Sequence, residues 1–123
     1  MKKTFVAISL ISVITIFSIK PNRVLSHALF NHSEPRVGEI ISSCPRQVRI
    51  WFDSPLEPSS STIQVENQGG KRVDNLDGHV DSSDAKILEV NLPCLSPGTY
   101  QVLWKVVSLD GHNTNGSFVF TLE

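Results

Sequence analysis

The stretch TYQVLWKVVS, from Thr99 to Ser108, decides the fold that this sequence predicts. Successive side chains of a strand point to opposite faces, so a repeat of period two predicts a strand with one buried face. The predicted buried face consists of Tyr100, Val102, Trp104 and Val106. This is the longest predicted strand, and it leads directly into the polar sequence Leu109-Asp110-Gly111-His112.

Shorter runs of the same kind fill the rest of the chain from residue 27 onward, separated by clusters of Pro, Gly, Ser, Asn and Asp. No segment there shows helical periodicity. Strands are predicted at 28–33, 48–53, 62–66, 87–92 and 117–122, with a short strand and a loop within 72–85. About seven short strands in so short a chain predict an all-β fold, either a Greek-key β-sandwich or a small barrel.

Residues 1–26 have the pattern of a cleaved secretory signal peptide. Lys2 and Lys3 precede an apolar run at 4–19, and Val24-Leu25-Ser26 offers small or aliphatic residues at the cleavage point. The run is shorter than the ~20 apolar residues of a comfortable membrane span, although an uncleaved N-terminal anchor remains an alternative. We therefore predict export to the periplasm, the cell surface or the extracellular space.

Cleavage after Ser26 would change the charge of the protein. Four of the 11 basic residues precede position 27, which leaves 7 against 12 acidic residues, a net charge of −5 for residues 27–123. An acidic domain without a basic cluster is a poor candidate for binding nucleic acid. Its charge is suited to solubility and to binding cations.

Cys44 and Cys94 are the two cysteines of the chain. In an exported protein the expected state is a disulfide, which here would close a long loop and stabilise the fold by about 4 kcal/mol. A thiolate pair that holds Cu(I) or Zn is the alternative. The cysteines are not in a Cys-x-x-Cys arrangement, and an oxidising compartment opposes free thiolates.

Asp110 and His112 are the first candidate metal ligands, because residues two apart can present their side chains to one point and Gly111 lets the backbone bend. His27 is the second. As the first residue of the cleaved chain it would offer two nitrogen donors, its α-amine and its imidazole Nδ1, which form a chelate ring. Three nitrogens and a carboxylate oxygen favour Cu(II). The alternatives are a histidine that falls at the cleavage point by chance and an ordinary Asp-Gly turn.

Other histidines and a serine give weaker signals. Asp77-Gly78-His79 repeats the same tripeptide in a polar, Asp-rich segment, where we interpret it as a hairpin turn. His32 lies an odd number of positions after His27 and would face the other side of a strand. Ser108 near His112 could suggest a hydrolase, but no nucleophile elbow accompanies it.

Several segments are informative when taken together. They include His27-Ala28-Leu29, the run Val48 to Asp53, and Leu95 to Val102. The most specific is Trp104 to His112, followed by Gly116-Ser117-Phe118. These segments resemble the CopC-type copper-binding proteins of the periplasm. The similarity runs in the expected order through nearly all of residues 27–123.

This resemblance implies an immunoglobulin-like β-sandwich or barrel at 27–123, a CopC-like copper-binding domain. It also implies a Cu(II) site built from His27, Asp110 and His112, with one copper per chain. Such proteins are associated with copper tolerance or uptake, often beside a CopD-type membrane copper transporter.

The sequence departs from the family pattern in two places. Some members hold Cu(I) in a Met-rich loop with a histidine, but the one methionine here is Met1, and His79 has no thioether neighbours. Some members have a Glu shortly after the Phe of an early strand. Here Asp53 and Glu57 follow Phe52, and neither matches that position cleanly.

We therefore expect an exported monomer that binds copper and buffers or delivers it by ligand exchange, without catalysis and without stable membrane insertion. Two alternatives remain open from the sequence. One is a copper oxygenase with an N-terminal histidine, and the other is a metal-free immunoglobulin-like interaction module.

Overall fold

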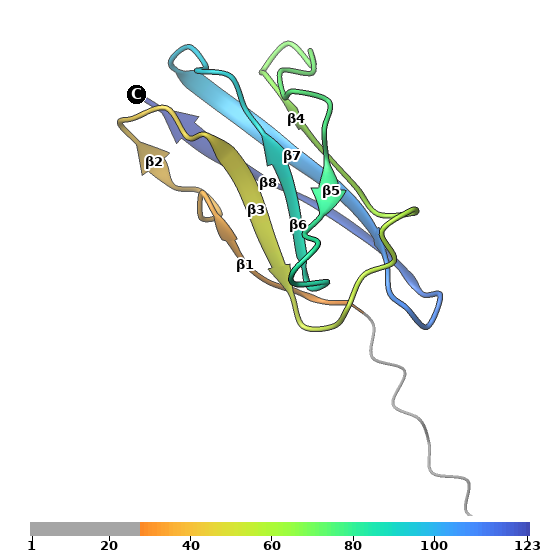
Figure 1. Ribbon diagram of the computed structural model, residues 1–123. Helices are drawn as coiled ribbons and strands as arrows, with labels where there is room; N and C mark the ends of the chain where they lie inside the picture. Colours follow the sequence, from red (N-terminus) through yellow and green to blue (C-terminus); the bar gives the residue numbers. More distant parts are fainter. Residues whose placement is uncertain (1–27) are drawn as a thin grey trace, which may run out of the picture.

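The structure, a computed structural model, describes residues 28–123 as two β-sheets packed face to face (Figure 1). The predicted signal peptide and His27 lie outside the described residues. The strands are β1 (Phe30–Glu34), β2 (Ile40–Ile41), β3 (Gln47–Phe52), β4 (Thr62–Glu66), β5 (His79–Val80), β6 (Ile87–Asn91), β7 (Gly98–Val107) and β8 (Asn113–Leu122). No helix in residues 28–123 is long and apolar enough to span a membrane.

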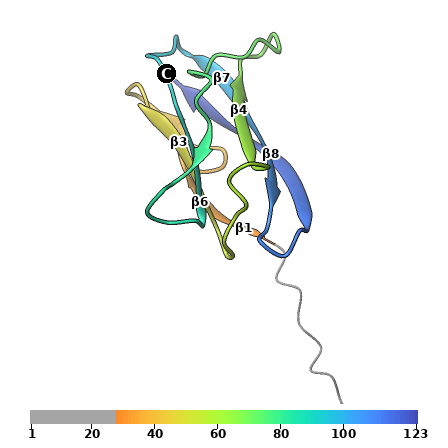
Figure 2. The same cartoon turned by 45° about the vertical axis from the view of Figure 1, so that its right-hand side comes forward.

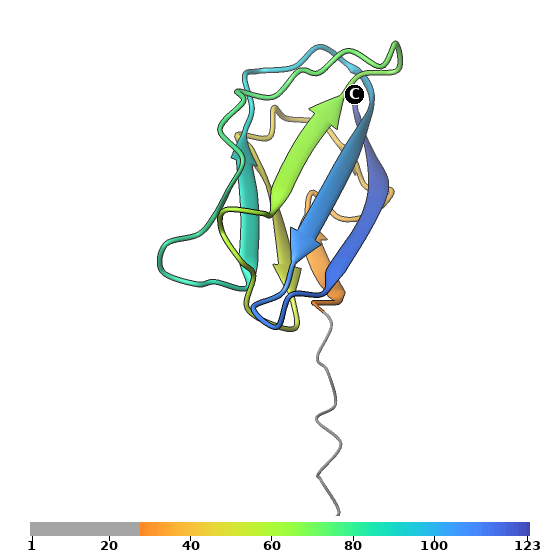
Figure 3. The same ribbon diagram turned by 90° about the vertical axis from the view of Figure 1, so that its right-hand side faces the viewer.

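Each sheet has four strands, in the orders β1-β3-β6-β5 and β2-β8-β7-β4. All neighbours are antiparallel except β2 and β8, which run parallel. The turned views in Figures 2 and 3 separate the two layers, with β4, β7 and β8 together in one of them. The predicted immunoglobulin-like β-sandwich is confirmed, with eight strands in the described residues where about seven were expected.

The core lies between the sheets, where the alternating strands meet. Val48, Ile50 and Phe52 of β3 are buried, as their period-two pattern predicts. On β7, Tyr100, Val102 and Val106 are buried and Trp104 is half-buried. The predicted inward face of the longest strand is therefore confirmed.

Trp104 explains why a glycine lies within the last strand. That strand was predicted at 117–122, but β8 begins at Asn113, and Gly116 lies inside it, directly opposite Trp104. A Cβ atom at position 116 would lie 2.5 Å from Cζ2 of Trp104. The indole is itself held against Phe52, with ring centroids 5.1 Å apart, and against Phe30. The glycine therefore makes room for the indole and does not end the strand.

Cys44 and Cys94 form the predicted disulfide, with their Cα atoms 5.3 Å apart. The bridge joins the β2–β3 connection to the β6–β7 connection. Both connections lie at the end of the sandwich where the C-terminus also lies (Figure 1).

The other end of the sandwich gathers three segments that are far apart in sequence. They are the first described residues, the β3–β4 connection and the β7–β8 loop (Figures 1 and 3). The backbone of Leu29 exchanges hydrogen bonds with Asp53, whose Oδ1 accepts from Leu29 N at 2.6 Å. The Leu109 amide donates to the carbonyl of Pro55 at 3.2 Å. This end of the sandwich carries Asp110 and His112.

Candidate metal site

The loop between β7 and β8 is a tight turn closed by its own backbone. The Gly111 amide donates to the Ser108 carbonyl at 2.9 Å, and the Ser108 amide donates to the His112 carbonyl at 3.0 Å. Gly111 has a φ of +89°, a left-handed conformation that only glycine adopts without strain. The glycine of this Asp-Gly-His sequence is therefore required by the turn.

The turn brings the Asp110 and His112 side chains together. Nδ1 of His112 lies 3.1 Å from Oδ1 of Asp110, and both side chains are about one-third exposed. The same oxygen accepts from the Ser108 hydroxyl and, at 3.3 Å, from the His112 amide. An imidazole nitrogen and a carboxylate oxygen thus converge on one point, as the two-residue spacing predicted.

Ser108 also affects the charge of this pair. Its hydrogen bond is the main cause that lowers the pKa of the Asp110 carboxyl, and contact with His112 lowers it further. The carboxylate therefore stays ionised well into the acid range. An ionised oxygen beside an imidazole suits a divalent cation.

Ala28 is the first described residue, and it is held close to this loop. It is fully buried, and its carbonyl accepts a hydrogen bond of 2.9 Å from Oγ1 of Thr114, which lies two residues after His112. His27, the predicted third ligand, precedes Ala28 directly in the sequence but lies outside the described residues. Among residues 28–123, no group of three or more His, Cys, Asp or Glu side chains is placed to hold a metal ion. Asp110 and His112 are thus the described part of the predicted site.

The carboxylates of Asp53 and Glu57 accept hydrogen bonds from other groups of the protein. Asp53 accepts from the Leu29 amide and so anchors the first described residues beside the β3–β4 connection. Glu57 accepts from the amide and the hydroxyl of Ser59 in its own turn. The anchoring role of Asp53 was not predicted, because its partner lies 24 residues away in sequence and no local pattern marks such a contact.

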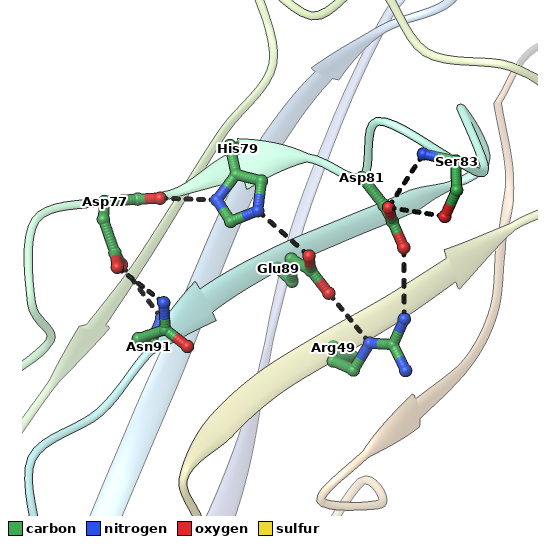
Figure 4. A network of polar contacts seen from close by, with 7 residues as sticks. All are labelled: Arg49, Asp77, His79, Asp81, Ser83, Glu89 and Asn91. Carbon is green, nitrogen blue, oxygen red and sulfur yellow. Dashed lines mark hydrogen bonds and ion pairs between the residues drawn. The ribbon is translucent and has the colours of Figure 1, made fainter.

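The other Asp-Gly-His sequence, residues 77–79, is arranged differently (Figure 4). The Asp77 carboxylate accepts from the backbone and side-chain nitrogens of Asn91, at 2.9 and 2.7 Å. Nδ1 of His79 lies 2.7 Å from the carbonyl oxygen of Asp77, so the carboxylate and the imidazole do not converge. Here the tripeptide is hydrogen-bonded to β6, the strand that pairs with β5.

The prediction of a hairpin turn at this tripeptide is wrong. His79 belongs to β5, and Gly78 has no left-handed φ. A Cβ atom at Gly78 would lie 2.9 Å from the carbonyl oxygen of Ile63. A residue without a side chain is needed at position 78, because the chain passes close to the backbone of β4.

The polar groups around His79 bind one another. Its Nε2 lies 3.0 Å from Oε1 of Glu89, whose other oxygen accepts from Nε of Arg49 at 2.9 Å (Figure 4). Arg49 also reaches Asp81, at 3.3 Å. His32 stacks on Trp51 on the outer face of the same sheet, with ring centroids 4.5 Å apart. Both histidines therefore have packing or pairing roles in the sheet.

The His79 network predicts a pH-dependent contribution to stability. The Asp77 carbonyl, and to a lesser extent Glu89, raise the pKa of His79 above its usual value. A raised folded-state pKa stabilises the protein below the unfolded pKa of about 6.5, and this stabilisation is lost as the pH rises through the folded pKa. We expect His79→Gln to lower the free energy of unfolding more at about pH 5.5 than at about pH 8.5, as measured by urea denaturation.

The Glu89→Gln variant is the control for this prediction. In that background the carboxylate partner is missing, so the pH dependence of the His79→Gln effect should shrink. An effect of equal size at both pH values in the wild-type background would contradict the prediction.

The fold and the site define a class: a small disulfide-bonded β-sandwich that carries a carboxylate–imidazole pair on the loop between its two longest strands. The chain belongs to the CopC family, since the CopC domain model matches residues 30–123. The family expected from the sequence is thus confirmed.

Two curated relatives cover most of this chain. Protein YobA of Escherichia coli strain K12 is 29% identical over 114 residues, which are 92% of this chain and 91% of YobA. The copper transport protein CutJ of Bacillus subtilis strain 168 is 32% identical over 103 residues, which are 83% of this chain but 19% of CutJ. The matched region is therefore a small part of that longer protein.

Solved structures show the same fold. The crystal structure of CopC from Methylosinus trichosporium OB3b superposes with a TM-score of 0.73 at 26% identity, covering 79% of this chain and 94% of that one. PcoC, a methionine-rich copper resistance protein of Escherichia coli, superposes with a TM-score of 0.68 at 22% identity, covering 80% and 100%. Membership of this family gives the chain a copper-related function.

Proposed function

We propose that the chain, cut after Ser26 and beginning at His27, binds one Cu(II) and buffers or delivers it outside the cytoplasm, in the periplasm or at the cell surface. The ligands are the α-amine and imidazole of His27, the carboxylate of Asp110 and the imidazole of His112. The observation that carries this proposal is the 3.1 Å approach of Asp110 Oδ1 and His112 Nδ1 at the end of the sandwich where the described chain begins.

The anchoring of Ala28 supports the assignment of His27. Neighbouring Cα atoms are about 3.8 Å apart, and Ala28 is tied to Thr114 on β8, close to His112 in sequence. A residue bonded to Ala28 is therefore within reach of the β7–β8 loop. A donor set of nitrogens and one carboxylate oxygen, without thiolate or thioether, favours Cu(II) over Cu(I).

The disulfide supports the location. Disulfides persist in oxidising compartments and are rare in the cytosol, so the Cys44–Cys94 bridge agrees with export by the predicted signal peptide. The same bridge occupies both cysteines and removes them as soft ligands for Cu(I).

Delivery to a membrane transport partner of the CopD type fits the match to CutJ. In that copper transport protein, a region similar to this chain is part of a longer polypeptide. We propose that this chain passes copper to such a partner by contact and ligand exchange. Ligand exchange needs no catalytic group, so the proposed role is binding and transfer.

A competition titration of residues 27–123 with Cu(II) tests the proposal. We expect one copper per chain, and an affinity that falls in acid because α-amines and imidazoles, with ordinary pKa values of about 8 and 6.5, must lose protons to bind. The lowered pKa of Asp110 keeps its carboxylate available over the same range. Absence of Cu(II) binding by the protein that begins at His27 would contradict the proposal.

A further inference from the structure

Ser108 is one of the few buried polar residues of the described chain. Its exposed fraction is 2%, and its backbone forms an isolated bridge with Leu56, which is fully buried. A serine in such a place needs a partner for its hydroxyl, because an unpaired buried hydroxyl is costly. The partner here is Oδ1 of Asp110.

The backbone of Ser108 is fixed from both sides of the loop. Its amide donates to the His112 carbonyl and its carbonyl accepts from the Gly111 amide. The hydroxyl has one proton to donate, and the Asp110 oxygen is nearer than the His112 carbonyl, which lies 3.4 Å away. Because the Ser108 backbone is fixed, its hydroxyl restricts the orientation of the Asp110 carboxylate.

The tripeptide at residues 77–79 has no such serine before it and serves as a comparison. The residue two positions before Asp77 is Asn75. The Asp77 carboxylate accepts its hydrogen bonds from Asn91 of β6 (Figure 4). Its histidine then faces a backbone carbonyl. Asp-Gly-His alone thus does not make an oxygen and a nitrogen converge, and the serine is one difference between the two copies, besides the left-handed Gly111.

We propose that Ser108 is a positioning residue that orients the Asp110 carboxylate for Cu(II). This inference rests on the proposed function. It adds Ser108 to the site as a fourth residue, one that does not itself contact the metal. Groups that hydrogen-bond to metal ligands restrict their rotation, and their loss typically costs about 10- to 100-fold in metal affinity.

The Ser108→Ala variant of residues 27–123 tests this role, with Ser61→Ala as a matched control. Ser61 is also buried, at 5% exposure, and its Oγ accepts from the Val107 amide at 3.2 Å. Each change removes one buried hydroxyl beside the end of β7, but Ser108 alone of the two contacts Asp110. We expect about 10- to 100-fold weaker Cu(II) binding for Ser108→Ala and wild-type affinity for Ser61→Ala.

Two further readouts separate positioning from a general loss of structure. The Tm of the metal-free proteins should fall by similar amounts in both variants, and the Cu(II) electron paramagnetic resonance spectrum should change for Ser108→Ala alone. Ser108→Thr, which keeps the hydroxyl, should bind copper with near wild-type affinity.

The outcomes distinguish this inference from the proposed function. If the wild-type protein binds no Cu(II), or if Asp110→Asn binds as tightly as wild type, the proposed site itself is wrong. If the wild type binds, Asp110→Asn weakens binding, and Ser108→Ala keeps wild-type affinity and spectrum, then Ser108 does not position the ligand.

Discussion

Replacing His112 with alanine in the protein that begins at His27 is expected to weaken Cu(II) binding by more than about 100-fold. Loss of an outer-shell hydrogen bond to a metal ligand already costs about 10- to 100-fold, and loss of a ligand removes the bond itself. A 100-fold loss corresponds to about 3 kcal/mol of binding free energy. The measurement is a titration against a competing chelator of known affinity at neutral pH.

His79→Ala is the matched control, because it changes the histidine of the other Asp-Gly-His sequence. His79 is about half-exposed and paired with Glu89, and its ring does not meet the Asp77 carboxylate. Its loss should leave Cu(II) affinity unchanged. Equal affinities for the His112→Ala and His79→Ala variants would show that the β7–β8 loop is not the binding site.

Removing the disulfide is expected to produce the largest loss of stability. Cys44 and Cys94 are 50 residues apart in sequence, and in the chain-entropy model a loop of this size contributes about 4 kcal/mol. For a domain of this size, we expect the Cys44→Ala/Cys94→Ala variant to unfold roughly 15–30 °C below wild type, as measured by calorimetry.

The same double variant should bind Cu(II) as wild type does at temperatures where it is folded. The bridge joins the β2–β3 and β6–β7 connections, and the β7–β8 loop lies at the other end of the sandwich (Figure 1). The reduced wild-type protein serves as a control, since it lacks the bridge but keeps every side chain. A Tm within a few degrees of wild type would contradict the stability prediction.

The β-sandwich could be predicted because its longer strands carry their own signal. The alternation of Val48, Ile50 and Phe52 in β3 matches the face that is buried. The two-residue strands β2 and β5 carry no such signal, since two residues cannot show a repeat. The position of β2 also depends on parallel pairing with β8, a contact between segments far apart in sequence.

The closeness of Asp110 and His112 was predicted correctly, but its physical cause differs from the expected one. The prediction relied on the two-residue spacing of side chains, with a backbone bend allowed at Gly111. In the structure a turn brings the two side chains together, with Gly111 in a left-handed conformation and Ser108 bonded to Asp110. The local sequence identified the pair, whereas the hydrogen bonds of the loop determine its geometry.

Contacts between distant segments could not be predicted from the sequence. Thr114 binds the carbonyl of Ala28 across 86 residues, and Asp53 binds the Leu29 amide across 24. Nothing in the local sequence around Thr114 or Asp53 marks these partners. They become visible only when the strands are assembled, and they bring the first described residues to the same end as the candidate ligands.

The central claim is that the metal site is completed by a free N-terminal histidine, and one measurement tests it most directly. The Cu(II) affinity of the protein that begins at His27 is compared with that of the same protein carrying one additional glycine before His27. The extension keeps every side chain but turns the α-amine into an amide, which removes the amine–imidazole chelate. We predict a loss of affinity of more than about 100-fold, beyond that of an outer-shell change, and equal affinities of the two proteins would contradict the claim.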